Sequence, residues 1–447
     1  MRGSRATGVA VVVALATAAA MAADPAPPPP PPVVATLAPP TAAEVREIDA
    51  ALVACGTRHS LSSWTDPRRG IGCARDRIVA YFTEAAKRDP AAKVVVDKFE
   101  ATSPRTKDQP APLENVLLVL EGSDPALKST VFLVSGHYDS MCSDVMDSSC
   151  DAPGADDDAS GSTVSIAAAR MLAGRPRRAT IVCATVAGEE QGLLGGKRLL
   201  EWAQQQGLKV GALLNHDIVG ATNGSQDRRP RVFSGEDPFA PQRQLGLWLE
   251  EFAGSEAVRL VFRKDRFGRG GDHLPFVDAG LPAVRFTEPR EDYRHQHQTP
   301  RTESGAEYGD LQKFMDFEFL AQVAATNAQA LLRLANAPAA PAAVIVEGAV
   351  QPDASVSFED VGADPERAGF EILVRDTTEV RWSQPRKVLT PGSYKLEGIT
   401  IDDRLFAVRA VGKNGLRSIA VDAKPVVKRP AGTPPPSTPP ATPPPPK

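Results

Sequence analysis

The sequence predicts an α/β fold, with a mostly parallel central sheet and helices on both faces, joined to a small C-terminal all-β sandwich. Two observations predict this division. Between residues 41 and 338, apolar runs of strand length alternate with segments of helical periodicity, the pattern of strand–helix–strand units. Between residues 340 and 428, short alternating strands such as VSFEDV and GFEILVRDT are separated by Pro, Gly and Asp turns, which favours a fibronectin-like sandwich.

Residues 1–40 precede both regions. Two arginines, an apolar run from about Val9 to Ala20 and the small residues Ala-Met-Ala form the pattern of a signal peptide over 1–23. Because the apolar run is shorter than the roughly 20 residues of a membrane span, we expect cleavage near Ala22 or Ala23, no stable membrane insertion, and a secreted or periplasmic protein. The Pro-rich segments 24–40 and 429–447 are expected to be an extended linker and a disordered tail.

Six strands are expected in the α/β region, and several are continuous apolar runs, as in strands covered on both faces. They fall at 93–99, 115–122, 130–136, 179–186, 210–217 and 281–288. Helical patterns fall at about 161–173, 193–206, 241–253 and 310–335. In an open sheet of this kind, ligands bind beyond the carboxyl ends of the strands.

Charge and cysteine usage narrow the class of protein. The 447-residue chain has a formal net charge of -4, and this mild acidity predicts no nucleic-acid partner, which would favour a basic stripe. Cys55 and Cys73 flank one short loop and Cys142 and Cys150 another, so two local disulfides are expected in an exported protein. Cys183 lies inside an apolar strand pattern and is expected to be a buried free thiol.

Carboxylates and histidines follow successive strand ends. They are His137 and Asp139 in SGHYDS, Asp156, Asp157 and Asp158 in GADDDASGS, Glu189 and Glu190 in AGEEQG, Asp217 in LNHDIVG, and His295 and His297 in YRHQHQ. Each one alone is explained by a turn, a helix cap or a solvated face. Together they converge at one edge of the sheet, where carboxylates at this density need a metal counter-ion. Nitrogen and oxygen ligands favour zinc, with cobalt or manganese as substitutes, and their number favours two ions.

These motifs, together with GRGGDHLPFVDAGLPA, resemble the co-catalytic di-zinc aminopeptidase family, over roughly residues 110–335 and in the same order. That family includes secreted bacterial leucyl aminopeptidases and, more distantly, glutamate carboxypeptidase II and transferrin-receptor-like proteins. The resemblance implies that 41–338 is a zinc peptidase domain that removes N-terminal residues from peptide or protein substrates. It implies five zinc ligands: His137, Asp157 as the bridging carboxylate, Glu190, Asp217, and His295 with His297 as the alternative.

The resemblance also implies roles beside the metals. Asp139 would orient His137 through its other ring nitrogen, and Glu189 would be the general base. A cis peptide bond would join the bridging aspartate to Asp158. Tyr293 is the candidate for the family's oxyanion-donating tyrosine, although its spacing is off by one. Because the strand stops before Glu189, the adjacent glutamates can approach the site by different routes.

The sequence departs from the family's pattern in two places. His137 and Asp157 are farther apart than in compact members, and the extra residues contain the Cys142–Cys150 loop. The last histidine is usually followed by an Asp-Thr pair, but here the run is YRHQHQTPRTE. Counting back from Thr299 selects His295, which we favour, whereas counting from Arg301 selects His297.

Other readings remain open at this point. Asp272 and His273 match a motif that shapes the substrate cleft, or they mark a helix start. A glutaminyl cyclase on the same scaffold would lack the first-site histidine. A glutamate-type carboxypeptidase would need an arginine cluster for the substrate's C-terminal carboxylate, for which the candidates are Arg266, Arg269 and Arg285. A non-catalytic binding protein is the alternative of another class, and the C-terminal sandwich is a candidate for binding a surface or polymer.

Overall fold

The computed structural model describes residues 34–383 and 385–426. The predicted signal peptide, most of the linker and the predicted tail lie outside these residues. The end of the linker packs on the α/β domain: Leu37 is buried, and its N–H donates to Gln329 Oε1 at 2.8 Å. Within the described ranges, no helix has both the length and the apolar character of a membrane span.

The central sheet has eight strands in the order β1-β2-β4-β3-β5-β8-β6-β7. Their bounds are β1 (Ala92–Ala101), β2 (Ala111–Leu120), β3 (Thr130–His137), β4 (Thr180–Val186), β5 (Lys209–His216), β6 (Arg231–Phe233), β7 (Arg259–Val261) and β8 (Ala283–Thr287). The four central strands β4, β3, β5 and β8 are parallel neighbours. Antiparallel pairing joins β1 to β2, β2 to β4 and β6 to β8. The predicted mostly parallel sheet is therefore confirmed, and the carboxyl ends of its central strands share one edge.

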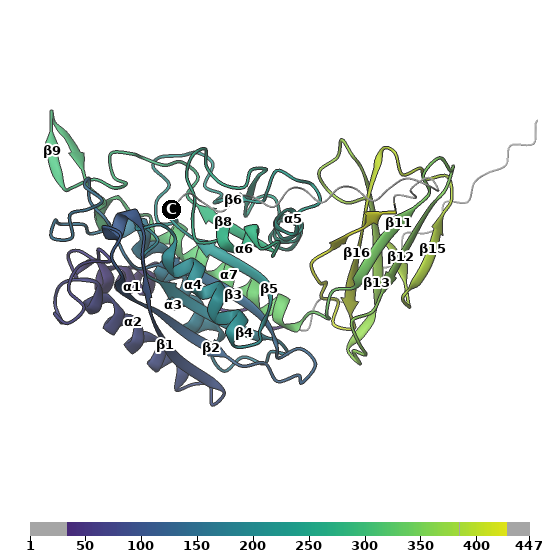
Figure 1. The fold of residues 1–447 in the computed structure, drawn as a ribbon, viewed down its shortest axis with the longest axis horizontal. Helices are drawn as coiled ribbons and strands as arrows, with labels where there is room; N and C mark the ends of the chain where they lie inside the picture. The colour runs from purple at the N-terminus through teal and green to yellow at the C-terminus, as the bar shows by residue number, and fades with distance from the viewer. Residues whose placement is uncertain (1–33, 384, 427–447) are drawn as a thin grey trace, which may run out of the picture.

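Helices cover both faces of this sheet (Figure 1). They are α1 (Ala42–Val53), α2 (Ile71–Ala86), α3 (Gly161–Leu172), α4 (Leu194–Gln205), α5 (Pro241–Ala253), α6 (Leu274–Asp278) and α7 (Phe317–Asn336). Successive strand side chains point to opposite faces, so neighbouring residues of one strand enter different cores. In β5, Leu213 packs in a core with Trp202 of α4 and Phe276 of α6, whereas Leu214 packs in the core that contains α1, α2, α3 and α7.

The predicted elements agree with the structure where the periodicity is strong. The helices expected at 161–173, 193–206 and 241–253 match α3, α4 and α5 to within one residue at each end. The helix expected from residue 310 begins only at Phe317, because Asp316 caps it by accepting the Phe319 N–H at 3.1 Å. No pattern in the sequence predicted α1, α2, β6 or β7.

Both expected disulfides are present, Cys55–Cys73 and Cys142–Cys150. Cys183 is buried and free, and burial raises the pKa of its thiol to about 12. A thiol of this kind is protonated at neutral pH and acts as a small apolar side chain. The expectations for all five cysteines are confirmed.

The C-terminal part forms two four-stranded sheets, ordered β15-β12-β11-β18 and β14-β13-β16-β17. The strands are β11 (Ala342–Glu347), β12 (Ala354–Glu359), β13 (Arg367–Asp376), β14 (Arg386–Val388), β15 (Gly392–Leu396), β16 (Arg404–Gly412), β17 (Val421–Asp422) and β18 (Lys424–Pro425). Side chains from both sheets share one core, which includes Val356, Ile372 and Phe406. The sheets therefore form the predicted all-β unit.

The β-unit contacts α5 of the α/β domain through polar groups. Trp248 Nε1 donates to the Arg417 carbonyl at 2.9 Å, and Arg409 donates to Glu251 at 2.5 Å. Arg409 also bonds Glu371 at 2.7 Å inside the β-unit, where both side chains are almost fully buried. Burial opposes ionisation of Glu371, but the charges of Arg409 and Arg417 outweigh it and lower its pKa. One arginine therefore joins a buried carboxylate to the neighbouring domain.

Replacing Arg409 should destabilise the protein. Arg409→Met removes a hydrogen bond to a buried carboxylate, which should lower the free energy of unfolding by about 1.5–3 kcal/mol. Arg404→Met is the matched control on β16, because Arg404 pairs with Asp376 while both side chains are about one-third exposed, and such a pair contributes about 0–1 kcal/mol. Denaturant unfolding of both variants measures the difference. Equal stabilities would contradict this account of Arg409.

Candidate active site

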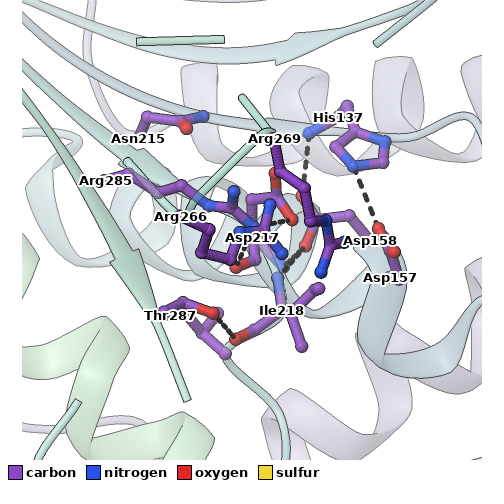
Figure 2. Close-up of polar contacts among 12 residues, drawn as sticks. His137, Asp157, Asp158, Asn215, Asp217, Ile218, Arg266, Arg269, Arg285 and Thr287 are labelled. Carbon is purple, nitrogen blue, oxygen red and sulfur yellow. Dashed lines mark hydrogen bonds and ion pairs between the residues drawn. The ribbon is translucent and has the colours of Figure 1, made fainter. Parts of the chain in front are cut away.

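His137 is the last residue of β3, and its surroundings hold the ring in place. Its backbone N–H donates to Asp158 Oδ2 at 2.9 Å, and its Nδ1 lies 3.1 Å from the Asp139 carbonyl and 3.5 Å from Asp139 Oδ1. The other ring nitrogen, Nε2, faces Asp157 Oδ1 at 3.2 Å (Figure 2). Asp139 is therefore beside the ring nitrogen that points away from the carboxylate cluster, as expected of an orienting residue.

The three aspartates of the run 156–158 make different contacts. Asp158 Oδ1 accepts the N–H groups of Gly161 at 2.8 Å and Ile218 at 3.3 Å, so it ties the start of α3 to the end of β5. Asp156 Oδ1 accepts the Gly220 N–H at 2.7 Å. The outer aspartates thus fix the backbone. The peptide bond after Asp157 is cis, as the resemblance implies.

Asp157 faces both histidines with different oxygens. Oδ1 lies 3.2 Å from His137 Nε2, and Oδ2 lies 2.8 Å from His297 Nε2. The backbone of the aspartate run is held from a distant segment, because Asp310 accepts the N–H of Asp156 at 2.8 Å and of Asp157 at 2.7 Å. Two oxygens aimed at two imidazoles are the geometry required of a carboxylate that bridges two ions.

The adjacent glutamates follow β4 in a turn. Gly188 adopts φ +84°, a conformation that glycine tolerates best. The N–H groups of Glu189 and Glu190 donate to the two oxygens of Asp139 at 3.3 and 3.1 Å. The Glu190 carboxyl is buried and lies 3.2 Å from His297 Nε2, whereas Glu189 is only partly buried. The turn therefore separates the two side chains, as the sequence analysis expected.

Asp217 follows β5 and pairs with a buried arginine. Arg285 Nη2 lies 2.7 Å from Asp217 Oδ1, and the guanidinium is fully buried (Figure 2). Burial raises the pKa of Asp217 and the charge of Arg285 opposes the rise. The carboxylate thus keeps one oxygen against the arginine, while the group also lies within reach of His137 and Asp157.

The preference for His295 as the last ligand is wrong, because His297 and not His295 lies beside the other candidate ligands. His297 contacts Asp157 and Glu190, whereas the His295 ring stacks on Phe314 with ring centroids 3.8 Å apart. A turn in the loop causes the exchange, because the Asp292 carbonyl accepts the N–H of His295 at 2.9 Å and His297 has φ +55°. Because of this turn, the spacing of the HQHQ run does not show which histidine points toward Asp157.

Two triads of possible ligands share one residue. His137, Asp157 and Asp217 form the first, and Asp157, Glu190 and His297 form the second, with ligand atoms within 4.8 Å of one another in each. His137 Nε2 and Glu190 Oε1 are buried, and their contacts at 3.2 Å are with other members of the two triads, Asp157 and His297. Imidazole nitrogens and carboxylate oxygens without thiolates suit zinc. The residues present therefore fit a pair of zinc ions that share Asp157.

The electrostatics of the cluster reflect its crowded charges. Burial opposes ionisation of Asp157, but the charges and hydrogen bonds of His297 and His137 hold its pKa well below the usual range. Burial also opposes the charged form of His297, yet Glu190 and Asp157 raise its pKa to about 11. Burial and neighbouring carboxylates raise the pKa of Glu189 well above its usual value, against the charge of His137. The cluster of carboxyl groups therefore favours the binding of cations and disfavours the binding of further anions.

Other predicted residues lie outside the two triads. Tyr293 is 65% exposed in the loop before His297, so its role as an oxyanion donor stays a prediction. Asp272 accepts the Gly196 N–H at 3.1 Å, and His273 Nε2 lies 3.0 Å from the Lys264 carbonyl; both side chains are buried, and α6 begins at the next residue. The motif therefore stands at a helix start, and its role in shaping the substrate cleft stays a prediction.

Sequence reasoning missed several residues that hold the site. Asp310 bonds the backbone of the aspartate run, and Gln296 donates to Asp157 Oδ2 at 3.1 Å. Ser60 Oγ donates to Asp139 Oδ2 at 3.2 Å, and Arg58 contacts the loop after His137. Only Gln296 had a local signal, because it directly precedes a candidate ligand. Ser60 and Arg58 lie about 80 residues from the residues that they bond, and Asp310 lies 153 residues from Asp157; none of the three belongs to a motif.

The chain is similar to known zinc metalloproteases in sequence. Residues 115–319 match the family described as "Peptidase family M28". A "Probable zinc metalloprotease" of Leptosphaeria maculans is 36% identical over 408 residues, which cover 85% of this chain and 94% of the relative. The chain belongs to peptidase family M28. It is therefore an M28 zinc metalloprotease, and the resemblance predicted from the motifs is confirmed.

Further similarities agree with the family. A "Probable zinc metalloprotease" of Pyricularia oryzae is 38% identical over 420 residues, covering 86% of this chain and 83% of the relative. Among solved structures, the LapA aminopeptidase of Legionella pneumophila is 18% identical, with a TM-score of 0.48 and coverage of 66% of this chain and 72% of that one. The Porphyromonas gingivalis glutaminyl cyclase is also 18% identical, with a TM-score of 0.48 and coverage of 65% and 97%. Neither solved structure distinguishes the reaction of this M28 protein.

Separate substitutions of the two histidines should show which one binds metal. His297→Ala removes a nitrogen from the second triad and should lower zinc content, with a loss of activity beyond about 100-fold, because even residues behind metal ligands contribute about 10–100-fold. His295→Ala should keep the zinc content and activity of the wild type. Metal analysis and peptidase assays on both purified variants test this. Zinc loss only in His295→Ala would reverse the assignment.

Proposed function

We propose that this M28 protein is a two-zinc aminopeptidase that hydrolyses the N-terminal residues of peptides. The observation that carries the proposal is the pair of triads sharing Asp157, with the carboxyl group of Glu189 beside them. His137 and Asp217 would hold one zinc ion, Glu190 and His297 the other, and Asp157 would bridge them. When bound, such a pair of ions polarises a scissile carbonyl and acidifies a water molecule.

Within this proposal, Glu189 accepts a proton from the attacking water and delivers it to the leaving amine. Its carboxyl interacts with the charges of His137 and Asp217, so it borders the first triad. It is partly exposed, unlike Glu190. Asp139 contributes to this step in two ways: it orients His137, and it accepts the backbone N–H of Glu189.

The arginines near the site support an aminopeptidase over a carboxypeptidase. Arg285 is fully buried and engaged with Asp217 and Asp265, and Arg266 bonds Glu291 and the Gly270 carbonyl with its side chain 10% exposed. Recognition of a C-terminal carboxylate by an arginine cluster uses unengaged guanidinium edges. Arg269 also bonds Glu291 at 3.0 Å, although its side chain is 31% exposed. A panel of free aminoacyl substrates, N-blocked controls and N-acyl peptides ending in glutamate tests the choice.

We also propose that the protein is exported, as a secreted or periplasmic enzyme. The pattern of residues 1–23 supports export, and two disulfides are the kind of bond that persists in oxidising compartments. Binding of a surface or polymer by the C-terminal β-unit stays a prediction. Binding assays on the full chain with its substrates and candidate polymers would test it.

Metal removal should abolish the activity reversibly. Treatment with a chelator should take two zinc ions from each chain, and added zinc should restore hydrolysis, because both triads contribute to one site. Metal content per chain and peptidase activity are measured across a zinc titration. An active enzyme that holds one tightly bound ion would contradict the two-zinc proposal.

The two glutamates should separate proton transfer from metal binding. Glu189→Gln keeps size and hydrogen bonding but cannot accept the proton, so it should retain both zinc ions while kcat falls by about 10²–10⁴. Glu190→Gln is the matched change at the neighbouring residue, and it should lose zinc from the second triad. Metal analysis and steady-state kinetics are compared for the pair. Zinc loss in Glu189→Gln, or full activity in that variant, would contradict the assigned roles.

A further inference from the structure

A short segment of the N-terminal region supports the loop that connects His137 to Asp157. The side chains of residues 57–60 are at most 2% exposed. This segment lies outside residues 115–319, which match the family, and outside both triads. It precedes the loop by about 80 residues of sequence, so its contacts with the loop exist only in the folded chain.

Arg58 bonds both ends of the loop with one guanidinium. Its Nε donates to the Tyr138 carbonyl at 2.7 Å, and its Nη2 donates to the Gly154 carbonyl at 2.8 Å. Its Nη1 donates to the Pro153 carbonyl. Tyr138 directly follows the histidine of the first triad, and Gly154 lies three residues before the shared aspartate. The planar guanidinium, with its fixed N–H donors, can bond two separate segments at once, and here the acceptors lie on the two ends of the loop.

The surroundings are shaped around this side chain. Gly154 has φ +52°, and a Cβ there would lie 2.8 Å from Arg58 Nη2 and 2.6 Å from the Ser140 Cβ. The Arg58 N–H donates to Ser140 Oγ at 3.1 Å, and Ser140 Oγ donates to the Ala152 carbonyl at 2.8 Å. Residue 57 also pairs with Ala152 in a parallel bridge. The two ends of the loop and the segment 57–60 therefore form one bonded unit.

A fully buried guanidinium requires bonded N–H groups and nearby negative charge, because an unpaired buried charge is strongly unfavourable. The three carbonyls meet the first requirement. Burial lowers the pKa of Arg58, and the carboxyl groups of Asp49, Asp310, Asp139 and Asp158 oppose this fall without cancelling it. Asp139 and Asp158 are also the residues that contact His137, so Arg58 lies beside the groups that hold the first triad.

We propose that Arg58 is a positioning residue of the metal centre, which sets His137 and Asp157 relative to each other by holding both ends of the loop between them. The proposal rests on the two-zinc site proposed above. It extends the centre to a segment that no metal ligand occupies. It also accounts for how a loop long enough to contain the Cys142–Cys150 disulfide leaves its two ends at fixed places.

Arg58→Lys tests this role. Lysine keeps the positive charge but cannot reproduce the planar fork. The variant should fold cooperatively, bind zinc about 10–100-fold more weakly, the usual effect of losing a residue that orients ligands, and change the visible spectrum of the cobalt-substituted protein. Zinc affinity is measured by competition with a chromogenic chelator, and folding by circular dichroism on heating.

Arg69→Lys is the matched control. Arg69 contacts the tip of the same loop, donating to the Ser149 and Cys150 carbonyls at 3.0 and 3.3 Å, with its side chain 44% exposed. It should keep wild-type zinc affinity and cobalt spectrum. Wild-type values in Arg58→Lys, equal effects in both variants, or failure of Arg58→Lys to fold would each overturn the positioning role. Fewer than two ions in the wild type would instead contradict the proposed function.

Discussion

Repulsion among buried carboxyl groups is the constraint that organises this protein. Asp157, Glu190 and Asp217 are buried together at the carboxyl ends of the central strands, with Glu189 beside them. Such a group is unfavourable unless positive charge is supplied. His137, His297 and Arg285 supply part of it within the chain, and zinc held by the two triads would supply the rest. The sheet, its loops and the N-terminal segment all serve to keep these groups together.

The backbone is held in the same way at or beside four of the five candidate ligands, His137, Asp157, Glu190 and Asp217. A carboxylate outside the triads accepts backbone N–H groups from a neighbouring turn and fixes that turn. Asp139 does so for the two glutamates, Asp158 for His137 and Ile218, and Asp310 for the aspartate run. One carboxyl group can accept several such bonds, because each of its two oxygens has two acceptor sites. At these positions, hydrogen bonds fix the backbone independently of the contacts that the side chain makes.

The rest of the chain frames this centre. The two helices α1 and α2 add to the core on one face of the sheet, and the segment between them carries Arg58. The C-terminal β-unit contacts α5 through Arg409 and Trp248, on the side of the domain away from α1 and α2 (Figure 1). It also contacts the segment before β4, where Arg178 pairs with Asp364 at 2.7 Å, and α5 contributes no residue to either triad.

The sequence by itself determined six of the eight strands of the central sheet, four of the helices and the placement of the candidate ligands at strand ends, because periodicity and residue type act locally. It also determined the disulfides, since each pair closes a short loop. Only the tertiary structure decided between His295 and His297, because a turn and a stacking contact with Phe314 set the path of that loop. The same holds for Arg58 and Asp310, whose partners are about 80 and 153 residues away. Contacts between such distant residues follow from how the sheet and helices pack, and no local pattern encodes them.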